Sequence, residues 1–528
     1  MRRLVLVVIV LLGLAAAYVA PTATPAPPPS AYRLVGSAVV VCPRSSAAGD
    51  STNVVGAYVA GPASGPGSAV LRPMEPGDDL VRLPAPGQPV ALRVAGQPQP
   101  TVVMLADGSW APSASSAVVA RQSSGAGSGL SSSACPAPGP AWWFVGAGSE
   151  IGRSAALLVS NPAEEPARFD ISLFSGAGPV PALAGKGIDL GPGATVRLRL
   201  DALAPDEDLL AIEVRATSGR VSAALRDVAV PADGRARGVD FIPAAQIPTT
   251  RVVVAGIPDG SGRRDLVLVN PGTQFATVTP RLLTEEGAES LAELATIAVP
   301  AGAVIQVDLA RILQGRAGSL DLASDVPVTG GLRAEWGDAT RDITWLAAVP
   351  LIGEPDPLAG AAAVPAGPGL TTTVVVAAPD GEVRGTLTTV TTDSPDAGAL
   401  SGGPRSGGQP EATELVLPEG FPRTVTDQVI VPAGSQRTII VPTGAADGDG
   451  ADTDTDTDTD GKAGSGATPA GLVTLSWRSD PGSAPAAISH LVLDPEVPLA
   501  TGYPWWPVAS SVAAVGVRED LGILAPTG

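Results

Sequence analysis

Few side chains in this 528-residue sequence could act as a nucleophile or a base in catalysis. His490 is the single histidine, and no Gly-x-Ser-x-Gly motif is present. A Ser-Lys pair would have to use Lys186 or Lys462, which are the two lysines of the chain. We therefore interpret His490 as an ordinary strand residue and predict a protein without catalytic, cofactor-binding or metal-binding residues. A pair of catalytic carboxylates has no fixed spacing in sequence, so an envelope hydrolase stays open.

Two other segments resemble ligand-binding motifs only in part. The glycine-rich residues 146–152 lack the spacing of a phosphate loop, and we predict a hairpin or loop there. An acidic tract runs from Asp447 to Asp460, and its end fits the first half of a calcium-binding EF-hand loop. The twelfth position of that loop should be a bidentate glutamate, but it is Ala467. We predict a solvated, disordered tract, with a weak calcium loop as the alternative.

Aromatic residues make up only 3% of the chain, so their clustering is informative. Six of them form two clusters, one in the first third of the chain and one near its end: Trp142, Trp143, Phe144, Tyr503, Trp505 and Trp506. Exposed indole rings can stack on sugar rings or occupy interfaces. We expect these residues to pack between domains, with contact to a ligand as the second interpretation.

The two cysteines, Cys42 and Cys135, are each followed by proline. In an exported protein, an even number of cysteines suggests a disulfide. A zinc site is the weaker alternative, because two thiolates alone do not complete its ligand set.

The N-terminus favours export. Met1-Arg2-Arg3 is followed by uncharged residues up to Ala20, and Ala15-Ala16-Ala17 offers a cleavage site. Residues 1–20 are therefore a signal peptide or, as we prefer, an uncleaved apolar helix that anchors the chain. The proline-rich residues 21–30 suit an extended stalk. The formal charge of −19 and the lack of a basic stripe argue against nucleic acid as a partner.

Internal repeats organise the rest of the chain. The Asn-Pro of Asn161-Pro162 recurs at Asn270-Pro271, and the alternating residues 193–200 recur at 302–309 with the same offset. Period-2 alternation indicates strands with one buried face. We predict an all-β protein of tandem immunoglobulin-like antiparallel β-sandwich modules, with a β-propeller-like closed repeat as the alternative. The expected units are an N-terminal β module, two sandwich repeats and a degenerate β module with disordered insertions near 394–410 and 444–468: residues 31–140, 141–248, 249–352 and 353–528.

The chain resembles an uncharacterised family of exported actinobacterial proteins, domain of unknown function family 5719. The resemblance is carried by the N-terminus, by both Cys-Pro pairs, by residues 142–146, by the two Asn-Pro strands and by Ser324-Asp325-Val326-Pro327-Val328. It implies immunoglobulin-like repeats and an envelope location, and it implies no activity.

These observations predict a non-catalytic extracytoplasmic scaffold or interaction protein of the cell envelope. A module that binds cell-wall glycan is the alternative. We expect an envelope protein or a glycan as partner, contact with the membrane only through residues 1–20, and no cofactor. The expected location is outside the cytoplasmic membrane, either tethered to it or secreted after signal cleavage.

Overall fold

The computed structural model describes most of the chain from residue 32 onward. The described residues are 32–34, 36–44, 51–61, 63, 65–94, 99–122, 128–229, 238–336, 342–354, 356–366, 370–393, 414–416, 423–441, 471–494, 499–508 and 511–513. The predicted N-terminal helix, the stalk, both predicted insertions and the acidic tract lie outside these residues. In the described part of the chain, no helix is long and apolar enough to span a membrane.

The chain divides into two units. The first comprises Met1–Leu34 and Ser511–Gly528, and within it β1 (Tyr32–Leu34) pairs antiparallel with β36 (Ser511–Ala513). The second unit, Val35–Ser510, contains all the other strands and is described by itself below.

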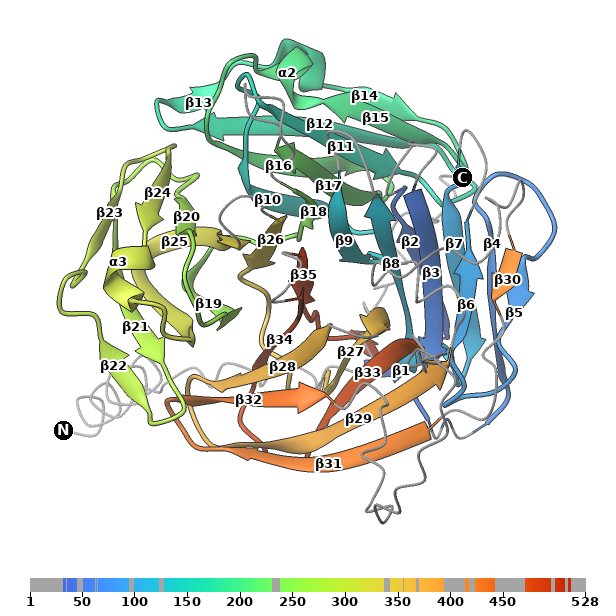
Figure 1. Cartoon of the computed structure of the whole chain (residues 1–528). Coiled ribbons are helices and arrows are strands. Elements are labelled where there is room, and N and C mark those ends of the chain that lie inside the picture. The colour runs from blue at the N-terminus through green and yellow to red at the C-terminus, as the bar shows by residue number, and fades with distance from the viewer. Residues whose placement is uncertain are drawn as a thin grey trace, which may run out of the picture. The chain divides into compact units, whose positions relative to one another are not determined.

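The second unit is built from antiparallel sheets that occur in four pairs (Figure 1). The predicted all-β class is therefore confirmed. Pair 1 has the strand orders β2-β7-β4-β5 and β30-β6-β3-β8-β9. Its strands are β2 (Ser37–Cys42), β3 (Ser51–Val59), β4 (Gly67–Pro73), β5 (Val81–Arg82), β6 (Val90–Arg93), β7 (Val102–Gly108), β8 (Ala114–Gln122), β9 (Gly129–Ala134) and β30 (Glu414–Val416).

Pair 2 has the strand orders β10-β16-β12-β13, with β14 also on β12, and β15-β11-β17-β18. Its strands are β10 (Ala141–Ala147), β11 (Arg153–Ser160), β12 (Ala167–Ser175), β13 (Gly178–Val180), β14 (Ile188–Leu190), β15 (Thr195–Arg199), β16 (Leu210–Ser218), β17 (Ser222–Ala229) and β18 (Val239–Ile242).

Pair 3 differs because one long strand, β25 (Gly318–Trp336), belongs to both of its sheets. The first half of β25 pairs with β19 and β21, and the second half pairs with β20 and β26. The other strands are β19 (Thr249–Ile257), β20 (Arg264–Val269), β21 (Ala276–Leu283), β22 (Ala288–Ser290), β23 (Ile297–Val299), β24 (Val304–Asp308) and β26 (Asp342–Ala347).

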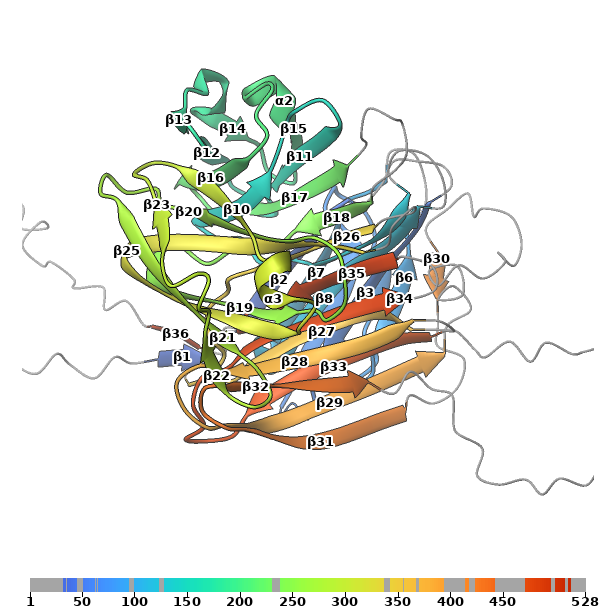
Figure 2. The same ribbon diagram turned by 60° about the vertical axis from the view of Figure 1, so that its left-hand side comes forward.

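Pair 4 has the strand orders β27-β33-β29-β31 and β32-β28-β34-β35, and Figure 2 shows β31 at an outer edge. Its strands are β27 (Leu358–Ala366), β28 (Thr371–Ala378), β29 (Val383–Asp393), β31 (Arg423–Val431), β32 (Ser435–Val441), β33 (Gly471–Ser479), β34 (Ala487–Asp494) and β35 (Leu499–Pro504).

One pairing scheme recurs in all four pairs. In pair 2, β16 lies between β10 and β12, and β11 lies between β15 and β17. The same relation holds for β7 between β2 and β4, for β33 between β27 and β29, and for the first half of β25 between β19 and β21. A last strand then adds to the second sheet of each pair, and these last strands are β9, β18, β26 and β35.

The two repeats detected in the sequence occupy equivalent places in pairs 2 and 3. Leu158 lies opposite Arg197, and Val267 lies opposite Gln306. Both apolar residues are buried, and both of their polar partners are exposed. The alternation in residues 193–200 and 302–309 predicts that Leu198 and Val307 lie on the buried face, but both are only half-buried because they lie on edge strands. The 109-residue alignment of the sequence is therefore confirmed at these positions.

The Asn-Pro turns have the predicted local role. The side-chain oxygen of Asn161 accepts from the amide of Ala163 at 3.1 Å, and that of Asn270 accepts from Gly272 at 3.0 Å. Each asparagine also donates to carbonyl groups across the turn, and neither is exposed to solvent. An asparagine that bonds to its own turn replaces strand pairing where the chain must reverse.

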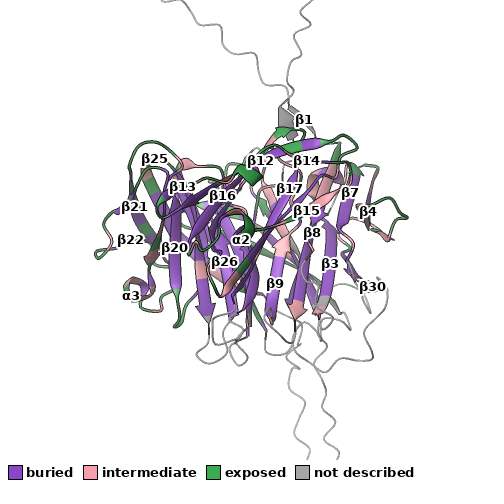
Figure 3. Ribbon diagram, turned by 90° about the horizontal axis from the view of Figure 1, so that it is seen from above, coloured by how far each residue is buried: buried purple, intermediate pink, exposed green. Residues whose placement is uncertain are grey.

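Apolar cores lie inside the sheet pairs and also between them (Figure 3). Pair 1 contacts pair 2 through a cluster that joins Cys42 to Leu158 and Phe241. Clusters around Trp143 and Val253 connect pair 2 with pair 3 and pair 3 with pair 4. Strand β27 of pair 4 contacts β3 and β8 of pair 1. The contacts thus follow a closed order, in which each pair touches the next and the last touches the first.

Candidate functional site

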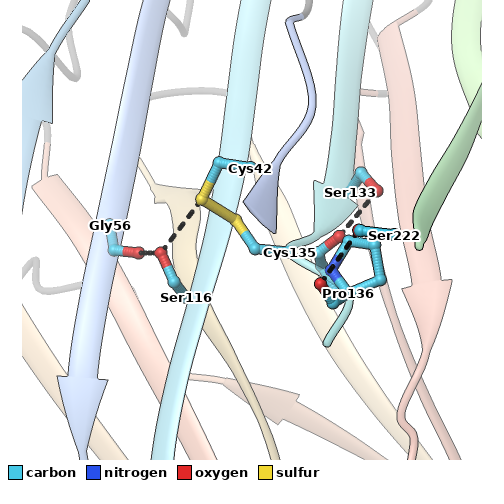
Figure 4. Close-up of a disulfide and its surroundings, with 8 residues drawn as sticks. Cys42, Gly56, Ser116, Ser133, Cys135, Pro136 and Ser222 are labelled. Atoms are coloured by element: carbon cyan, nitrogen blue, oxygen red, sulfur yellow. Dashed lines mark hydrogen bonds between the residues drawn. A yellow bond between two sulfur atoms is a disulfide. The ribbon is translucent and has the colours of Figure 1, made fainter. Parts of the chain in front are cut away.

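Cys42 and Cys135 form the predicted disulfide (Figure 4), with their Cα atoms 4.3 Å apart. Cys42 is the last residue of β2, and Cys135 directly follows β9. Backbone hydrogen bonds hold both ends, from Val41 to the carbonyl of Pro136 at 3.0 Å and from Cys135 to that of Ser116 at 2.9 Å. The bond therefore joins the edge strand of one sheet of pair 1 to the last strand of the other.

A pocket of about 850 Å³ lies beside this disulfide, with Cys135 in its wall. Its walls come from β2, β8 and β9 of pair 1, from β10, β17 and β18 of pair 2, and from the residues at and after the end of β35. All of these residues belong to the second unit. This volume lies within the range of pockets that enclose small molecules, about 300–1,000 Å³.

Five of the six aromatic residues singled out from the sequence line this pocket. They are Trp142, Phe144, Tyr503, Trp505 and Trp506. Residues about 360 positions apart therefore meet in one cavity, although neither cluster alone indicates that the other is near. Phe241, which lies outside both aromatic clusters of the sequence, is a sixth aromatic in the wall.

Trp143 faces away from the pocket. Successive side chains of a strand point to opposite faces, so Trp142 and Phe144 share one face of β10 and Trp143 lies on the other. The ring of Trp143 stacks on Phe174, with 5.7 Å between ring centroids, and is buried where pair 2 meets pair 3. Trp143 therefore packs between sheets, as the first interpretation of the aromatic clusters predicted.

The indole rings of the pocket are held by hydrogen bonds to the protein. Trp142 donates to the carbonyl of Val221 at 2.8 Å, and Trp506 donates to that of Ala244 at 3.3 Å. Trp142 is half-buried, whereas Trp506 is 36% exposed and lies at the edge of the wall. With the indole N–H groups satisfied, these rings present apolar faces to the cavity.

His490 contacts two aromatic residues of the pocket wall, Trp505 and Tyr503. It lies in β34, as the strand interpretation predicted, and its Nδ1 accepts a hydrogen bond from the indole of Trp505 at 3.0 Å. Its ring meets Tyr503 edge-on at 4.4 Å. Complete burial lowers the pKa of His490 to about 3, so the ring is neutral at physiological pH. Its role here is to position Trp505 and Tyr503.

The hydroxyl of Tyr503 is the polar atom of the wall that lacks a partner. The side chain is 4% exposed, and its oxygen has no hydrogen-bond partner among the residues the structure describes. Burial raises the pKa of Tyr503, so the hydroxyl keeps its proton and can donate. The oxygen has almost no accessible surface, so it is an unsatisfied polar atom inside the wall and does not face the cavity.

The described wall of the pocket carries a single charged side chain. Among the described residues that line it there is no carboxylate, no lysine and no histidine, and Arg220 is the one charged side chain. Arg220 is exposed and lies in the turn between β16 and β17. It forms no ion pair with any residue in the described ranges. The wall is otherwise apolar residues, serines and prolines, and proline has no N–H to donate.

Two buried carboxyl groups lie where the last strands of the four pairs meet. Asp342 of β26 accepts backbone hydrogen bonds from Leu130 of β9 and Ala500 of β35 at 3.1 Å, and from Val239 of β18 at 3.4 Å. Asp240 of β18 accepts from the Ser132 amide of β9 at 3.1 Å. Burial raises the pKa of Asp342 to about 8 and that of Asp240 well above its usual range. The two carboxyl groups thus accept hydrogen bonds from backbone N–H groups of edge strands that find no carbonyl acceptor in their own sheets.

Residues 148–152 form a loop between β10 and β11, and residues 146 and 147 end β10, so the predicted hairpin or loop is confirmed. The hydroxyl of Ser149 donates to the carbonyl of Ala204 and accepts from the amide of Glu207 at 3.0 Å. The space beside Gly148 is taken by Arg153, whose Nη1 lies 2.6 Å from where a Cβ would stand. The side chain of Arg153, the first residue of β11, thus lies directly against the backbone of the loop at Gly148. Within the described ranges, no three potential metal-ligating side chains lie close enough together to share an ion.

A comparison with known families matches residues 90–400 to the family of unknown function DUF5719. The chain belongs to this family. The match spans all of pairs 2 and 3, and it includes Trp142, Phe144 and Phe241 of the pocket but not residues 503–508. No curated protein matches the sequence.

Proposed function

We propose that this protein is a non-catalytic binding scaffold of the cell envelope that holds its ligand in the aromatic pocket. The observation that carries the proposal is the meeting of Trp142 and Phe144 with Tyr503, Trp505 and Trp506 in one cavity. Large apolar cavities with a few polar groups are the usual form of small-molecule sites. The surrounding wall is braced by sheets on several sides and by the disulfide.

We also propose an extracytoplasmic location, with residues 1–20 as the tether or as a cleaved signal. The disulfide supports it, because such bonds persist in oxidising compartments. In this location the scaffold would touch the membrane only through its N-terminus.

Each sheet pair is further proposed to be a variant of the immunoglobulin-like sandwich. The pairing of β11 with β15 and of β12 with β16 and β13 follows that plan. The terminal strands differ from it, since β10 pairs with β16 and β17 pairs with β11.

A cell-wall glycan-binding module is the second candidate. The partly exposed rings of Trp142 and Trp506 favour it, because indole faces stack on sugars. The lining favours it less, since the described wall offers neither carboxylates nor amide side chains for sugar hydroxyls. We therefore rank an apolar ligand first.

Titration of the purified chain with Nile red, an uncharged apolar fluorescent probe, tests the proposal. Ala38 is a half-buried wall residue on β2, so Ala38→Trp should fill the pocket and abolish probe binding. Ala298 is an exposed residue of β23, and Ala298→Trp is the matched control that should bind as the unchanged chain does. If both variants bind the probe equally well, the pocket is not the binding site. Displacement of the probe by soluble cell-wall glycan fragments, and not by apolar compounds, would favour the second candidate.

A further inference from the structure

We infer that the ligand of the pocket is an anionic amphiphile, with an apolar chain inside the cavity and a carboxylate or phosphate group at Arg220. This inference rests on the proposed function and names the class of its ligand. It is carried by two features of the wall: its apolar lining and the unpaired, exposed arginine.

The lining fits a chain of methylene groups better than a polar molecule. Accessible apolar surface comes from the half-buried side chains of β2, from Trp142 and from Trp506. Five prolines of the wall add surface without N–H donors: Pro136, Pro138, Pro243, Pro504 and Pro507. An apolar ligand gains by leaving water for such a wall, whereas a polar ligand loses hydrogen bonds to water that the wall does not replace.

Arg220 supplies the anion site. Its guanidinium is exposed, and no described carboxylate lies in the pocket wall to neutralise it. The chain as a whole carries a formal charge of −19, so an unpaired arginine beside an acid-free cavity is a local exception. A guanidinium binds carboxylates and phosphates through paired hydrogen bonds. Arg220 would thus hold the head group in water while the chain enters the cavity.

Tyr503 forms a rigid, buried part of the wall and supplies no polar contact to the cavity. His490 and Trp505 fix the ring in place.

The test uses 11-(dansylamino)undecanoic acid and its primary amide, which share the chain and the reporter and differ in charge. The full-length protein should bind the acid at least tenfold more tightly than the amide. Arg220→Ala should remove this preference, because it should weaken the binding of the acid and leave the binding of the amide unchanged. Arg311→Ala, which removes an exposed arginine of the short helix α3 (Ala310–Leu313), should leave both affinities unchanged.

Competition with oleic acid and with 1-oleoyl lysophosphatidic acid distinguishes a carboxylate from a phosphate head group. Equal binding of acid and amide, or the same loss in Arg220→Ala and Arg311→Ala, would overturn the anionic head group and leave the pocket standing. If Ala38→Trp changes the binding of no probe, the proposed function fails as well. The melting temperature of each variant shows that it is folded; both arginines are exposed, so neither substitution should lower it.

Discussion

At the scale of single residues, the carboxyl of Asp342 makes stability depend on pH. Its folded pKa of about 8 lies above the unfolded value of about 3.9, because burial disfavours its charge. The folded state therefore binds this proton more tightly than the unfolded state. The resulting stabilisation is complete below about pH 4 and is lost as the pH rises towards 8.

The substitution Asp342→Asn should remove this dependence. We compare the free energy of unfolding of the variant with that of the unchanged chain. The difference should shift in favour of the variant as the pH rises from 4 to 8, by up to about 1.4 kcal/mol for each pH unit. At pH 5 the variant should be less stable by about 1–3 kcal/mol, since an amide cannot accept all the hydrogen bonds that Asp342 accepts. Urea denaturation across this range measures both effects. Parallel curves for the two proteins would contradict the assignment.

The turn asparagines permit a paired prediction. Asn161→Ala and Asn270→Ala should each lower the free energy of unfolding by about 2–3 kcal/mol, because buried carbonyl and amide groups lose their partners. Gln306→Ala, at an exposed position, should change it by less than about 0.5 kcal/mol. Chemical denaturation gives the comparison. A large difference between the two asparagine variants would show that the two repeats are not equivalent.

At the scale of elements, the disulfide fixes β2 against the end of β9. Replacing both Cys42 and Cys135 by alanine should lower stability by about 2–5 kcal/mol, because the bond closes a long loop in the unfolded chain. The same change should weaken probe binding, since Cys135 is part of the pocket wall. Thermal melting with and without reductant provides the control, and the reductant should have no effect on the double variant.

Local patterns predicted the elements well. The alternation in Ala276–Leu283 specifies a strand with one buried face, and the structure shows that face buried. The same rule places Trp143 opposite Trp142 and Phe144, a consequence that follows from spacing alone. The meeting of β10 with the residues after β35 could not be predicted, because local periodicity carries no information on which sheets pack together. Asp240 and Asp342 were missed for the same reason: their acceptor role exists only where four distant strands meet.

At the scale of the second unit, the sheet pairs share their apolar surface with their neighbours. Trp143 and Val145 of pair 2 are buried against Val267 and Ala347 of pair 3, and further clusters join the other neighbours. Asp342 of pair 3 accepts hydrogen bonds from last strands that belong to pairs 1, 2 and 4. A sheet pair removed from the unit would expose these surfaces and leave these groups without partners.

We therefore expect the unit to unfold in one cooperative step. Scanning calorimetry should give a single transition whose calorimetric and van't Hoff enthalpies agree, because the unfolding of any one pair removes a neighbour from two others. An excised pair 2, residues 139–248, should lack cooperative unfolding and bind apolar dyes, since it exposes Trp143, Val145 and Phe241. A fragment that melts sharply, or several separate transitions in the full chain, would instead indicate independent sandwiches. In that case the walls of the aromatic pocket, which come from three sheet pairs, would not be held together by the fold alone.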